Sequence, residues 1–513
     1  MRRLLLPVAI AAIAAISLGQ SAASAVATDG RSSANATLHQ YASSTWASFV
    51  AMTGPSGLPA DSLGLDGTRS VQTSTTNIAA YLWSAVVAED LHIISRHELV
   101  SRLSATLDTL ERMERHQPSG QFYNWYDARD GAKLTVWPPS GQPITPILSS
   151  VDNGWLATGL RVVRGAVPEL AERAGELYDS MNFSLYYRPA VNRILFFYAP
   201  STGEAPCCYD TIVSESRIAS YIGIANGQLP QREYFGAWRA FPATCAYSFQ
   251  ETKPSGPTNT YFGQTVFDGS YEYAGMRITP SWGGSAFEDL MPALFVPEEN
   301  WGPRSWGLNH PNTVRAQIYH GLVEARYGYW GFSPANNPDG GYSAYGVDAV
   351  GSNPDGYPSN NDNTLVDAGF DLAGCARPAK PAPPPSAYTN GVVTPHASFL
   401  GLRWDRDAVL NNLDRLRRDF DIYSKWGFRD SVDVGTGGTT GVVAQQKPPD
   451  HRGVVSPFYL SLDQGIIMAA IGNELSSDLL RRAFSGPDMQ HLVRPVIRVE
   501  RFNDSPPPGD GAG

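Results

Sequence analysis

The chain has 513 residues and is acidic, with 49 Asp and Glu against 39 Lys and Arg and a formal net charge of −10 at pH 7. An acidic surface repels the phosphates of nucleic acids and other anionic polymers, so we expect neither as substrate or partner. A neutral partner is favoured.

The first residues have the pattern of a secretory signal peptide. Two arginines precede an apolar run from Leu4 to about Leu18, and Ala23-Ser24-Ala25 forms a cleavage pattern. Residues 1–27 are therefore predicted to be a signal peptide, and the mature protein to be secreted into the extracellular space. No later run approaches the ~20 apolar residues that a membrane-spanning helix needs, so no span is expected.

Helical periodicity dominates the rest of the chain, and few strands are expected. Apolar residues recur at helical spacing in 35–52, 75–92, 95–116, 150–164, 167–181, 211–226, 230–239, 284–296, 311–328, 394–402, 405–420, 462–474 and 476–485. Long Gly/Pro/Asn-rich loops connect these segments. The loop from Gly331 to Asn363 is too long for a simple connection and is expected to carry part of a site. The pattern predicts an all-α fold.

Residues 28–500 are predicted to form a single domain. The proline-rich segment from Cys375 to Gly391 could be read as an interdomain linker. Because it is short and the helical pattern resumes at Val393, we interpret it as an insertion loop. Residues 501–513, rich in Pro, Gly and Asp, are predicted to be a disordered tail. The protein is expected to be a monomer.

The four cysteines of an exported chain permit two disulfides in three pairings. A bond between the neighbours Cys207 and Cys208 would be strained, which favours Cys245 and Cys375 as their partners. Free buried thiols are the alternative. The sequence contains no CxxC motif or Cys/His cluster that would indicate zinc.

One acid, Glu215, lies in an unexpected place. Read as a helix, residues 211–226 put Glu215 on the same face as Ile218, Ala219 and Ile222, while the polar residues occupy the other side. Burial raises the pKa of a carboxyl group and keeps its proton at neutral pH, as a general acid requires. The alternative is a buried ion pair between Glu215 and an arginine.

Three other acids lie near the ends of apolar helices. Asp152 shares a face with Trp155, Glu288 shares one with Phe295, and Asp463 precedes a helix that is apolar all round. If alternate helices form an inner ring, its mouth gathers these acids into a carboxylate-lined cleft. The alternatives are that Asp152 and Asp463 cap their helices and that Glu288 pairs with an arginine such as Arg277.

Paired carboxyl groups fit glycoside hydrolysis. One protonated carboxyl group donates to the leaving oxygen, while a carboxylate activates water or attacks the sugar. The many tryptophans and tyrosines offer flat apolar faces with polar tips, which suit pyranose rings.

Six motifs, in this order, resemble those of the glucoamylase-like glycoside hydrolases: "TSTTNIAAYLWS", "SSVDNGWLATGL", "YDTIVSESRIASYIGIANGQLP", "SWGGSAFEDLMPALF", "NGVVTPHASFLGL" and "FYLSLDQGIIMAAIGN". That group includes the endo-β-1,2-glucanases of glycoside hydrolase family 144 and the transglycosylating domains of cyclic β-1,2-glucan synthases. The motifs extend from about Thr73 to Asn473.

The resemblance implies an (α/α)₆ barrel with long loops over the cleft, a neutral glucan substrate and carboxylate catalysis without a metal or other cofactor. It places the expected acid at Glu215 and aligns two further site acids with Glu288 and Asp463. The chain departs from the family pattern at Ser216, where relatives have Ala, and at Asp289, where they have Tyr. Because Asp289 lies where substrate is expected, linkage specificity transfers less well than activity.

The catalytic residues are thus expected to be Glu215 as acid, with Asp152, Glu288 and Asp463 as base or substrate-binding groups. Residues expected to bind substrate are Trp125, Trp155, Tyr209, Arg217, Trp282, His396 and Gln464. We expect inversion of the anomeric centre and endo cleavage. The alternatives are an exo-acting or transglycosylating enzyme, a non-catalytic glycan-binding protein on the same scaffold, and a polysaccharide lyase using a histidine such as His310, His320 or His396.

Overall fold

The structure is a computed structural model that describes residues 10–240, 254–352, 391–435 and 452–502. Its described residues are mostly helical. The α-helices are α1 (Ile10–Met52), α2 (Thr75–Asp90), α3 (Arg96–Arg112), α4 (Ser150–Ala166), α5 (Ala171–Asp179), α6 (Arg217–Ala225), α7 (Ala286–Leu290), α8 (Glu298–Trp301), α9 (Trp306–Tyr319), α10 (Pro395–Leu400), α11 (Arg406–Asp419), α12 (Ser461–Leu475), α13 (Leu479–Phe484) and α14 (Arg494–Val499).

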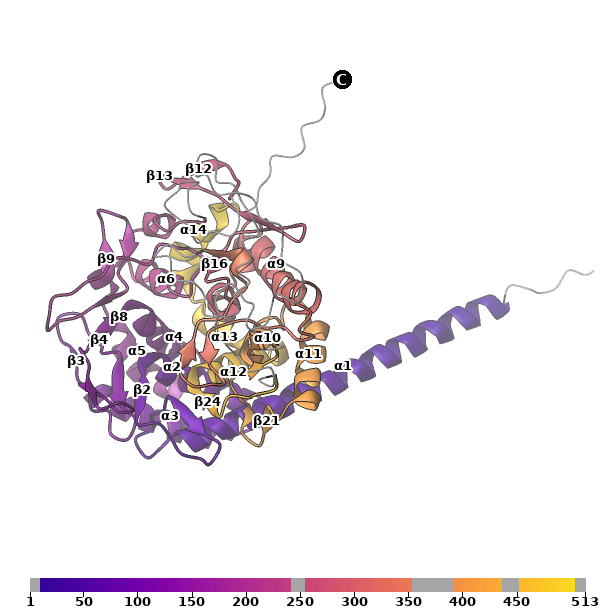
Figure 1. Ribbon diagram of the computed structural model, residues 1–513, viewed down its shortest axis with the longest axis horizontal. Coiled ribbons are helices and arrows are strands. Elements are labelled where there is room, and N and C mark those ends of the chain that lie inside the picture. Colours follow the sequence, from indigo (N-terminus) through magenta and orange to yellow (C-terminus); the bar gives the residue numbers. More distant parts are fainter. Residues whose placement is uncertain (1–9, 241–253, 353–390, 436–451, 503–513) are drawn as a thin grey trace, which may run out of the picture.

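Six helices follow one another round a closed ring. The helix α2 packs against α4, α4 against α6, α7 against α10, α10 against α12, and α12 against α2. Arg217 connects α6 to α7, because it lies at the start of α6 and its guanidinium donates to the carbonyl of Glu288 in α7 at 2.7 Å. Between these ring helices the chain runs through α3, α5, α9 and α11, and Figure 1 shows α2, α4, α10 and α12 gathered near the centre of the body.

Small residues let the ring helices approach closely. A Cβ added at Gly154 of α4 would lie 3.0 Å from Ala219 of α6, and one at Gly159 would lie 2.9 Å from Ala79 of α2. A Cβ at Gly465 of α12 would meet Ala80 at 2.5 Å. Glycine is therefore required at these three contacts between ring helices, because a side chain there would force the helices apart.

Ring burial was expected for Trp155, Ile218, Phe287 and Ile467, and this is confirmed. All four are at most 5% exposed and belong to one apolar cluster. The helix α12 is buried all round its first three turns, which explains why it is apolar on every side. Serine side chains cap three ring helices by accepting the backbone N–H of the third helical residue: Ser74 for α2, Ser149 for α4 and Ser285 for α7.

The strands are short, as expected, and form two-stranded ribbons. They are β1 (Ser62–Gly64), β2 (Gln72–Ser74), β3 (Arg115–His116), β4 (Gln121–Phe122), β5 (Trp125–Asp127), β6 (Val136–Trp137), β7 (Gln142–Pro143), β8 (Leu148–Ser149), β9 (Tyr187–Arg188), β10 (Arg193–Ile194), β11 (Phe197–Tyr198), β12 (Thr258–Tyr261), β13 (Gln264–Phe267), β14 (Tyr271–Tyr273), β15 (Met276–Ile278), β16 (Ser281–Trp282), β17 (Ala335–Asn336), β18 (Tyr342–Ser343), β19 (Gly351–Ser352), β20 (Val392–Val393), β21 (Tyr423–Ser424), β22 (Gly427–Phe428), β23 (Val432–Asp433) and β24 (Phe458–Leu460). The ribbon of β1 with β24 joins the two ends of the ring, since β1 precedes α2 and β24 leads into α12.

The described elements at both ends differ from the expected bounds, since the helix expected over 35–52 begins at Ile10. The helix α1 extends well beyond the body (Figure 1) and includes most of the predicted signal peptide, while residues 1–9 lie outside the described residues. Among the described residues, no helix is both long and apolar enough to cross a membrane. At the other end, Phe502 is fully buried against Trp306, although it lies in the predicted tail. The rest of that tail, residues 503–513, lies outside the described part.

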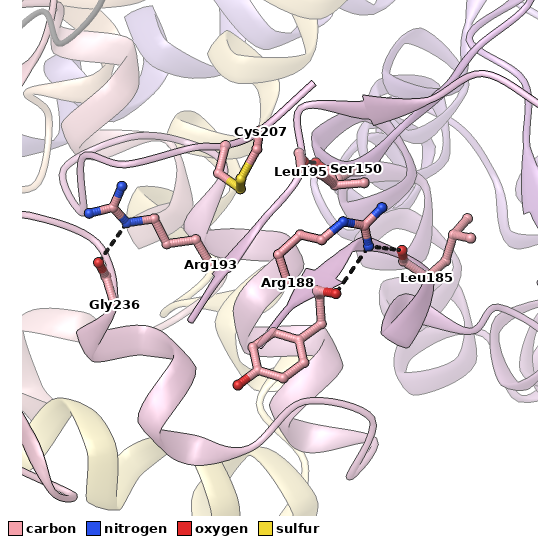
Figure 2. Close-up of a disulfide and its surroundings, with 9 residues drawn as sticks. Ser150, Leu185, Arg188, Arg193, Leu195, Cys207 and Gly236 are labelled. Carbon is pink, nitrogen blue, oxygen red and sulfur yellow. Dashed lines mark hydrogen bonds between the residues drawn. A yellow bond between two sulfur atoms is a disulfide. The ribbon is translucent and has the colours of Figure 1, made fainter. Parts of the chain in front are cut away.

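The predicted disulfide pairing is wrong for Cys207 and Cys208, which are joined to each other (Figure 2). Backbone hydrogen bonds hold both ends of this dipeptide in a tight loop: Phe196 N–H donates to the carbonyl of Pro206, and Tyr209 N–H to that of Ile194. The two sulfurs therefore face one another. The expected partners Cys245 and Cys375 lie outside the described residues.

Candidate active site

Glu215 lies just before α6 and not within it. The helix begins at Arg217, so the expected helix 211–226 is wrong for its first six residues, and Glu215 is in the turn that leads into α6. Its side chain is half-buried. The indole N–H of Trp155 donates to Glu215 Oε2 at 2.5 Å, and no arginine pairs with Glu215 among the described residues.

Glu288, in the first turn of α7, lies beside Glu215. Its Oε2 accepts the backbone N–H of Glu215 at 2.7 Å, and its own N–H is capped by Ser285. Arg277, which the sequence offered as a partner of Glu288, donates to Ser255 and Ser270 instead. Glu288 is therefore fixed against the turn that carries Glu215.

Burial and the charge of Glu288 favour the protonated form of Glu215. Burial raises the pKa of Glu215 well above its ordinary value, and the nearby charge of Glu288 raises it further. Burial likewise raises the pKa of Glu288. Two carboxyl groups this close cannot both ionise readily, so the pair retains a proton near neutral pH. This is the state that a general acid needs.

Asp152 completes this first group of acids from the start of α4. Its Oδ1 accepts from the hydroxyl of Thr76 at 2.5 Å. With the amide of Asn124 oriented to satisfy both its contacts, Asn124 donates to Asp152 Oδ2 at 2.8 Å and accepts from the indole of Trp125 at 3.0 Å. Burial raises the pKa of Asp152. Its backbone N–H is capped by Ser149, so Asp152 is not itself the cap.

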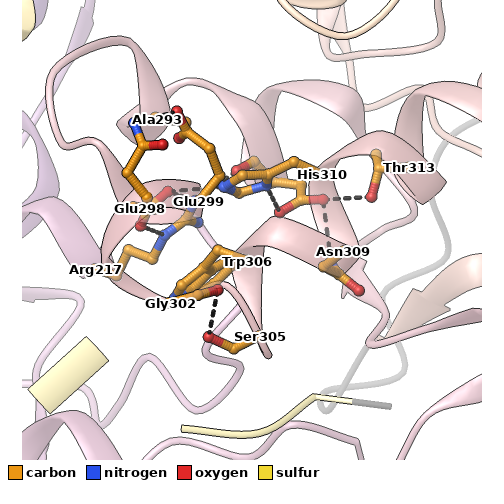
Figure 3. A network of polar contacts seen from close by, with 12 residues as sticks. Arg217, Ala293, Glu298, Glu299, Gly302, Ser305, Trp306, Asn309, His310 and Thr313 are labelled. Atoms are coloured by element: carbon orange, nitrogen blue, oxygen red, sulfur yellow. Dashed lines mark hydrogen bonds and ion pairs between the residues drawn. The ribbon is translucent and has the colours of Figure 1, made fainter. Parts of the chain in front are cut away.

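The prediction that Arg217 binds substrate is wrong. The residue is 2% exposed, and all five of its N–H groups are engaged. They donate to both carboxylate oxygens of Glu298 and to the backbone carbonyls of Ser214, Glu288 and Asp289. Arg217 thereby ties the turn that carries Glu215 to the helix that carries Glu288. Figure 3 shows its guanidinium paired with Glu298.

A second buried cation, His310, completes this network. Its Nδ1 lies 3.0 Å from Asp289 and its Nε2 3.2 Å from Glu298. Although burial lowers the pKa of His310, the charge of Asp289 and then contacts with Glu298 raise it to about 9. The network therefore contains two cations and two carboxylates, all fully or almost fully buried. His310 is committed to the network, which does not favour its use as a lyase base.

The raised pKa of His310 predicts a pH dependence of stability. A histidine that is more basic in the folded state stabilises it fully below the unfolded pKa of about 6.5, and this contribution is lost as pH rises through about 9. We expect the free energy of unfolding to fall over this range. His310→Gln should be less stable at pH 6 and show a flatter profile in urea titrations; parallel profiles would contradict the assignment.

A second group of acids gathers at the start of α12. Asp463 and Asp430 are each 2% exposed, and Asp61 lies near both. Burial, followed by the charge of Asp430, raises the pKa of Asp463 well above its ordinary value, and burial raises that of Asp430. His396 Nδ1 lies 3.4 Å from Asp463 Oδ1 and accepts from or donates to Thr394 at 2.8 Å.

Several buried polar atoms of this second group lack hydrogen bonds within the described part of the chain. Four buried atoms have no hydrogen-bond partner among the residues that the structure describes: Asp430 Oδ1, Asp463 Oδ2, His396 Nε2 and Gln464 Oε1. One ligand atom each from His396, Asp430 and Asp463 lie within 4.8 Å of one another. A nitrogen with two carboxylate oxygens is a donor set that a divalent cation accepts. The sequence does not predict such a centre.

Tyr342 lies near acids of both groups. It lies on β18, in the long loop that was expected to carry part of a site, and 57% of its surface is exposed. Burial of its phenol end, followed by the charges of Asp463, Asp430, Glu215 and Glu288, raises its pKa. Its hydroxyl group therefore lies within electrostatic reach of acids from both groups.

The remaining residues expected to bind substrate differ in exposure: some are half-buried and the others are almost fully buried. Tyr209, Trp125 and Trp282 are half-buried, and the pKa of Tyr209 is raised by burial and then by the charge of Glu215. Trp155 is fully buried and Gln464 and His396 are 1% exposed. Trp155 was expected to bind substrate, but its ring lies in the core against Trp83 and Phe295, and only its N–H reaches the site, where it donates to Glu215.

Sequence reasoning missed several polar residues of the site. Asp430, Asp61, Thr76 and Asn124 were not selected, since three of them lie in loops without helical periodicity and Thr76 is one of four consecutive Ser and Thr residues. The run "FRDSVDV", with an acid between apolar residues that follow a helix, was a signal for Asp430.

A comparison with family models identifies the family of this chain. The Glycoamylase model, described as "Putative glucoamylase", matches residues 213–486, which is more than half of the chain. The chain belongs to the Glycoamylase family. A second model, DUF3131, a protein of unknown function, matches residues 40–187 of this Glycoamylase-family chain.

Relatives of this Glycoamylase-family chain include the cyclic beta-(1,2)-glucan synthase NdvB of Rhizobium meliloti (strain 1021), which is 26% identical over 351 residues. The match covers 68% of this chain and 10% of the synthase, so the chain spans about a tenth of that relative's length.

Solved structures share the fold of this Glycoamylase-family chain. The endo-beta-1,2-glucanase from Chitinophaga pinensis, in complex with sophorotriose and glucose, has a TM-score of 0.60 at 16% identity over 90% of this chain and 98% of that chain. The endo-beta-1,2-glucanase from Talaromyces funiculosus, in complex with sophorose, has a TM-score of 0.63 at 12% identity over 93% and 91%. At such identities the similarity shows the fold alone.

Proposed function

We propose that this protein is a secreted glycoside hydrolase that cleaves a neutral glucan, preferably a β-1,2-glucan, by carboxylate acid and base catalysis. The observation that carries the proposal is the glutamate pair, in which Glu215 keeps a proton and is positioned by the indole of Trp155. Membership of the Glycoamylase family and the fold shared with endo-beta-1,2-glucanases support a glucan substrate.

In the proposed mechanism, Glu215 donates its proton to the leaving glycosidic oxygen. The base comes from the second group of acids, Asp463 with Asp430, because the raised pKa values leave this pair able to share one proton and still supply a carboxylate at neutral pH. Glu288 stays beside the acid, where the backbone N–H of Glu215 holds it. We propose inversion, in which a water molecule enters between the acid and the base.

Several further properties belong to the proposal. We place the catalytic unit in residues 28–500 as one (α/α)₆ barrel that acts as a monomer, with its long loops over the substrate and residues 1–27 removed on export. The ring of six helices supports the barrel. The exposed ring of Tyr342 and the half-buried Trp125 and Trp282 supply the apolar faces on which sugars stack.

The test is a substrate screen with purified protein. We expect reducing ends to appear from β-1,2-glucan, and less or none from β-1,3-glucan, β-1,6-glucan, α-glucans and uronans. Proton NMR should show the α-anomer first from a β-linked substrate. Binding without turnover would indicate a glycan-binding protein, and unsaturated products from uronans would indicate a lyase. Longer or cyclic products would indicate transfer to sugar, as the similarity to a glucan synthase allows.

The Trp155–Glu215 hydrogen bond predicts a shift of the pH profile. The indole N–H stabilises the Glu215 carboxylate and so lowers its pKa, which means that Trp155→Phe should raise it. A general acid works while protonated, so activity falls as pH rises through its pKa. We expect the alkaline limb of kcat against pH to move to higher pH.

Trp83→Phe is the matched control for this shift. Trp83 is also fully buried and packs against Trp155, but its N–H donates to the carbonyl of Gly465 at 2.9 Å. Both variants lose a similar volume from the same core, and only Trp155→Phe should move the alkaline limb. An equal shift in both would attribute it to core packing.

A further inference from the structure

Four arginines surround a hollow on the surface near the end of the described chain. Arg494, Arg498 and Arg501 recur at helical spacing along and just after α14, whose opposite face is buried in the core through Val496 and Ile497. Arg304 joins them from the segment between α8 and α9, because Phe502 N–H donates to its carbonyl at 2.9 Å. The hollow has a volume of about 670 Å³ and is also lined by Gln490, Pro495 and Val499.

Most of this positive charge has no internal partner. Arg304, Arg494 and Arg498 are exposed, and none forms an ion pair or side-chain hydrogen bond with another residue that the structure describes. Several other surface arginines of this chain are paired with acids, for example Arg96 with Glu169 and Arg173 with Asp108.

The acids on the elements packed against α14 are already engaged. In α8, Glu298 pairs with Arg217 and Glu299 with Arg481. The carboxylate of Asp488, before the π-helix 489–493, pairs with Arg161, and that of Glu500 pairs with Arg239. Glu233 of the 3₁₀ helix 231–235 is buried and accepts from Ser220. Arg304, Arg494 and Arg498 therefore form a cluster of positive charge without a paired acid among the described residues, on a chain with a net charge of −10.

We infer that this hollow binds a phosphate group. The arginine guanidinium presents paired donors that match the oxygens of a phosphate, and several arginines around one concave surface can bind it from different sides. The absence of lysine from the lining favours this geometry over a general attraction for anions. The site is separate from the proposed catalytic residues, so it would attach the enzyme to a phosphate-bearing molecule while a neutral glucan is cleaved elsewhere.

The test compares two variants of the full chain with equal charge. The hollow variant is Arg304→Gln/Arg494→Gln/Arg498→Gln, and the control is Arg164→Gln/Arg173→Gln/Arg418→Gln, which removes three arginines paired with acids. Calorimetry with inorganic phosphate at low salt should give binding by the wild type and the control. The hollow variant should bind about tenfold more weakly or not at all, and added NaCl should weaken the wild-type binding.

Vesicles distinguish the source of the phosphate. Cosedimentation with phosphatidylglycerol but not phosphatidylcholine, lost in the hollow variant alone, would support the inference and identify a lipid headgroup as the source. Binding of phosphate without vesicle binding would support it and indicate a soluble phosphate compound. Equal binding by both variants, or no phosphate binding, overturns it. So does binding that occurs only after removal of residues 503–513, because the chain's own tail would then be the occupant.

Discussion

Glu215→Gln is expected to slow glucan cleavage by about 10²–10⁴-fold while the protein stays folded, because glutamine keeps the shape of the side chain and has no proton to donate. Its amide can still accept the indole N–H of Trp155, which donates to Glu215 Oε2 in the wild type. The loss should appear in kcat more than in KM, since the proton moves in the transition state. The measurement is the initial rate of reducing-end release at the pH optimum.

Glu233→Gln is the matched control for this result. Glu233 is also a buried glutamate with a pKa raised by burial, to about 7, but it accepts from Ser220 away from the proposed site. Its replacement should leave turnover near that of the wild type. A substrate with an acidic leaving group, such as a dinitrophenyl glucoside chain, needs less proton donation and should recover much of the lost rate. Near-normal turnover of natural glucan by folded Glu215→Gln would exclude Glu215 as the acid.

Arg217→Met is expected to lower the free energy of unfolding by about 3–5 kcal/mol, because it leaves the carboxylate of Glu298 buried with one of its cations removed. The guanidinium also holds the carbonyls of Ser214 and Glu288, so the remaining folded protein should have a lower kcat. Urea or thermal unfolding, followed by circular dichroism, measures the first effect and initial rates measure the second.

An exposed ion pair provides the comparison. Arg418 lies 3.4 Å from Asp414 with both side chains about 60% exposed, so Arg418→Met should cost less than about 1 kcal/mol. Equal losses in the two variants would mean that Arg217 contributes no more than a surface pair. In Arg217→Met/Glu298→Gln, removal of the unpaired charge should restore part of the stability but not the kcat, because the carbonyls of the turn stay untied.

The ring helices could be predicted because each carries its own local signals. Serine caps mark the starts of α2, α4 and α7, and α12 is apolar on every side. The start of α6 was misjudged because apolar residues at helical spacing continue through a turn whose backbone is held by contacts with α7. Periodicity reports which residues are buried and cannot show where a tertiary contact ends a helix.

The candidate acids could be predicted from their apolar surroundings, but their partners could not. Whether Arg217 faces substrate or the core depends on Glu298, which lies in a short helix without periodicity. The proximity of Asp430 to Asp463 depends on the return of the chain from α11 to the start of α12. The bond between Cys207 and Cys208 likewise depends on backbone contacts with residues 194–196. Such contacts join segments that are distant in sequence.

The closure of the helix ring has a consequence for the order of folding. Helix α2 is synthesised early and buries its surface against both α4 and α12, and β1 pairs with β24 immediately before α12. The apolar face of α2 therefore lacks one of its partners until the C-terminal ring helix has been made. Contacts between segments so far apart in sequence slow folding, because the entropy of closing the loop is lost before these contacts form. We expect the chain to reach its native state only after synthesis is complete, and to need protection from aggregation until then.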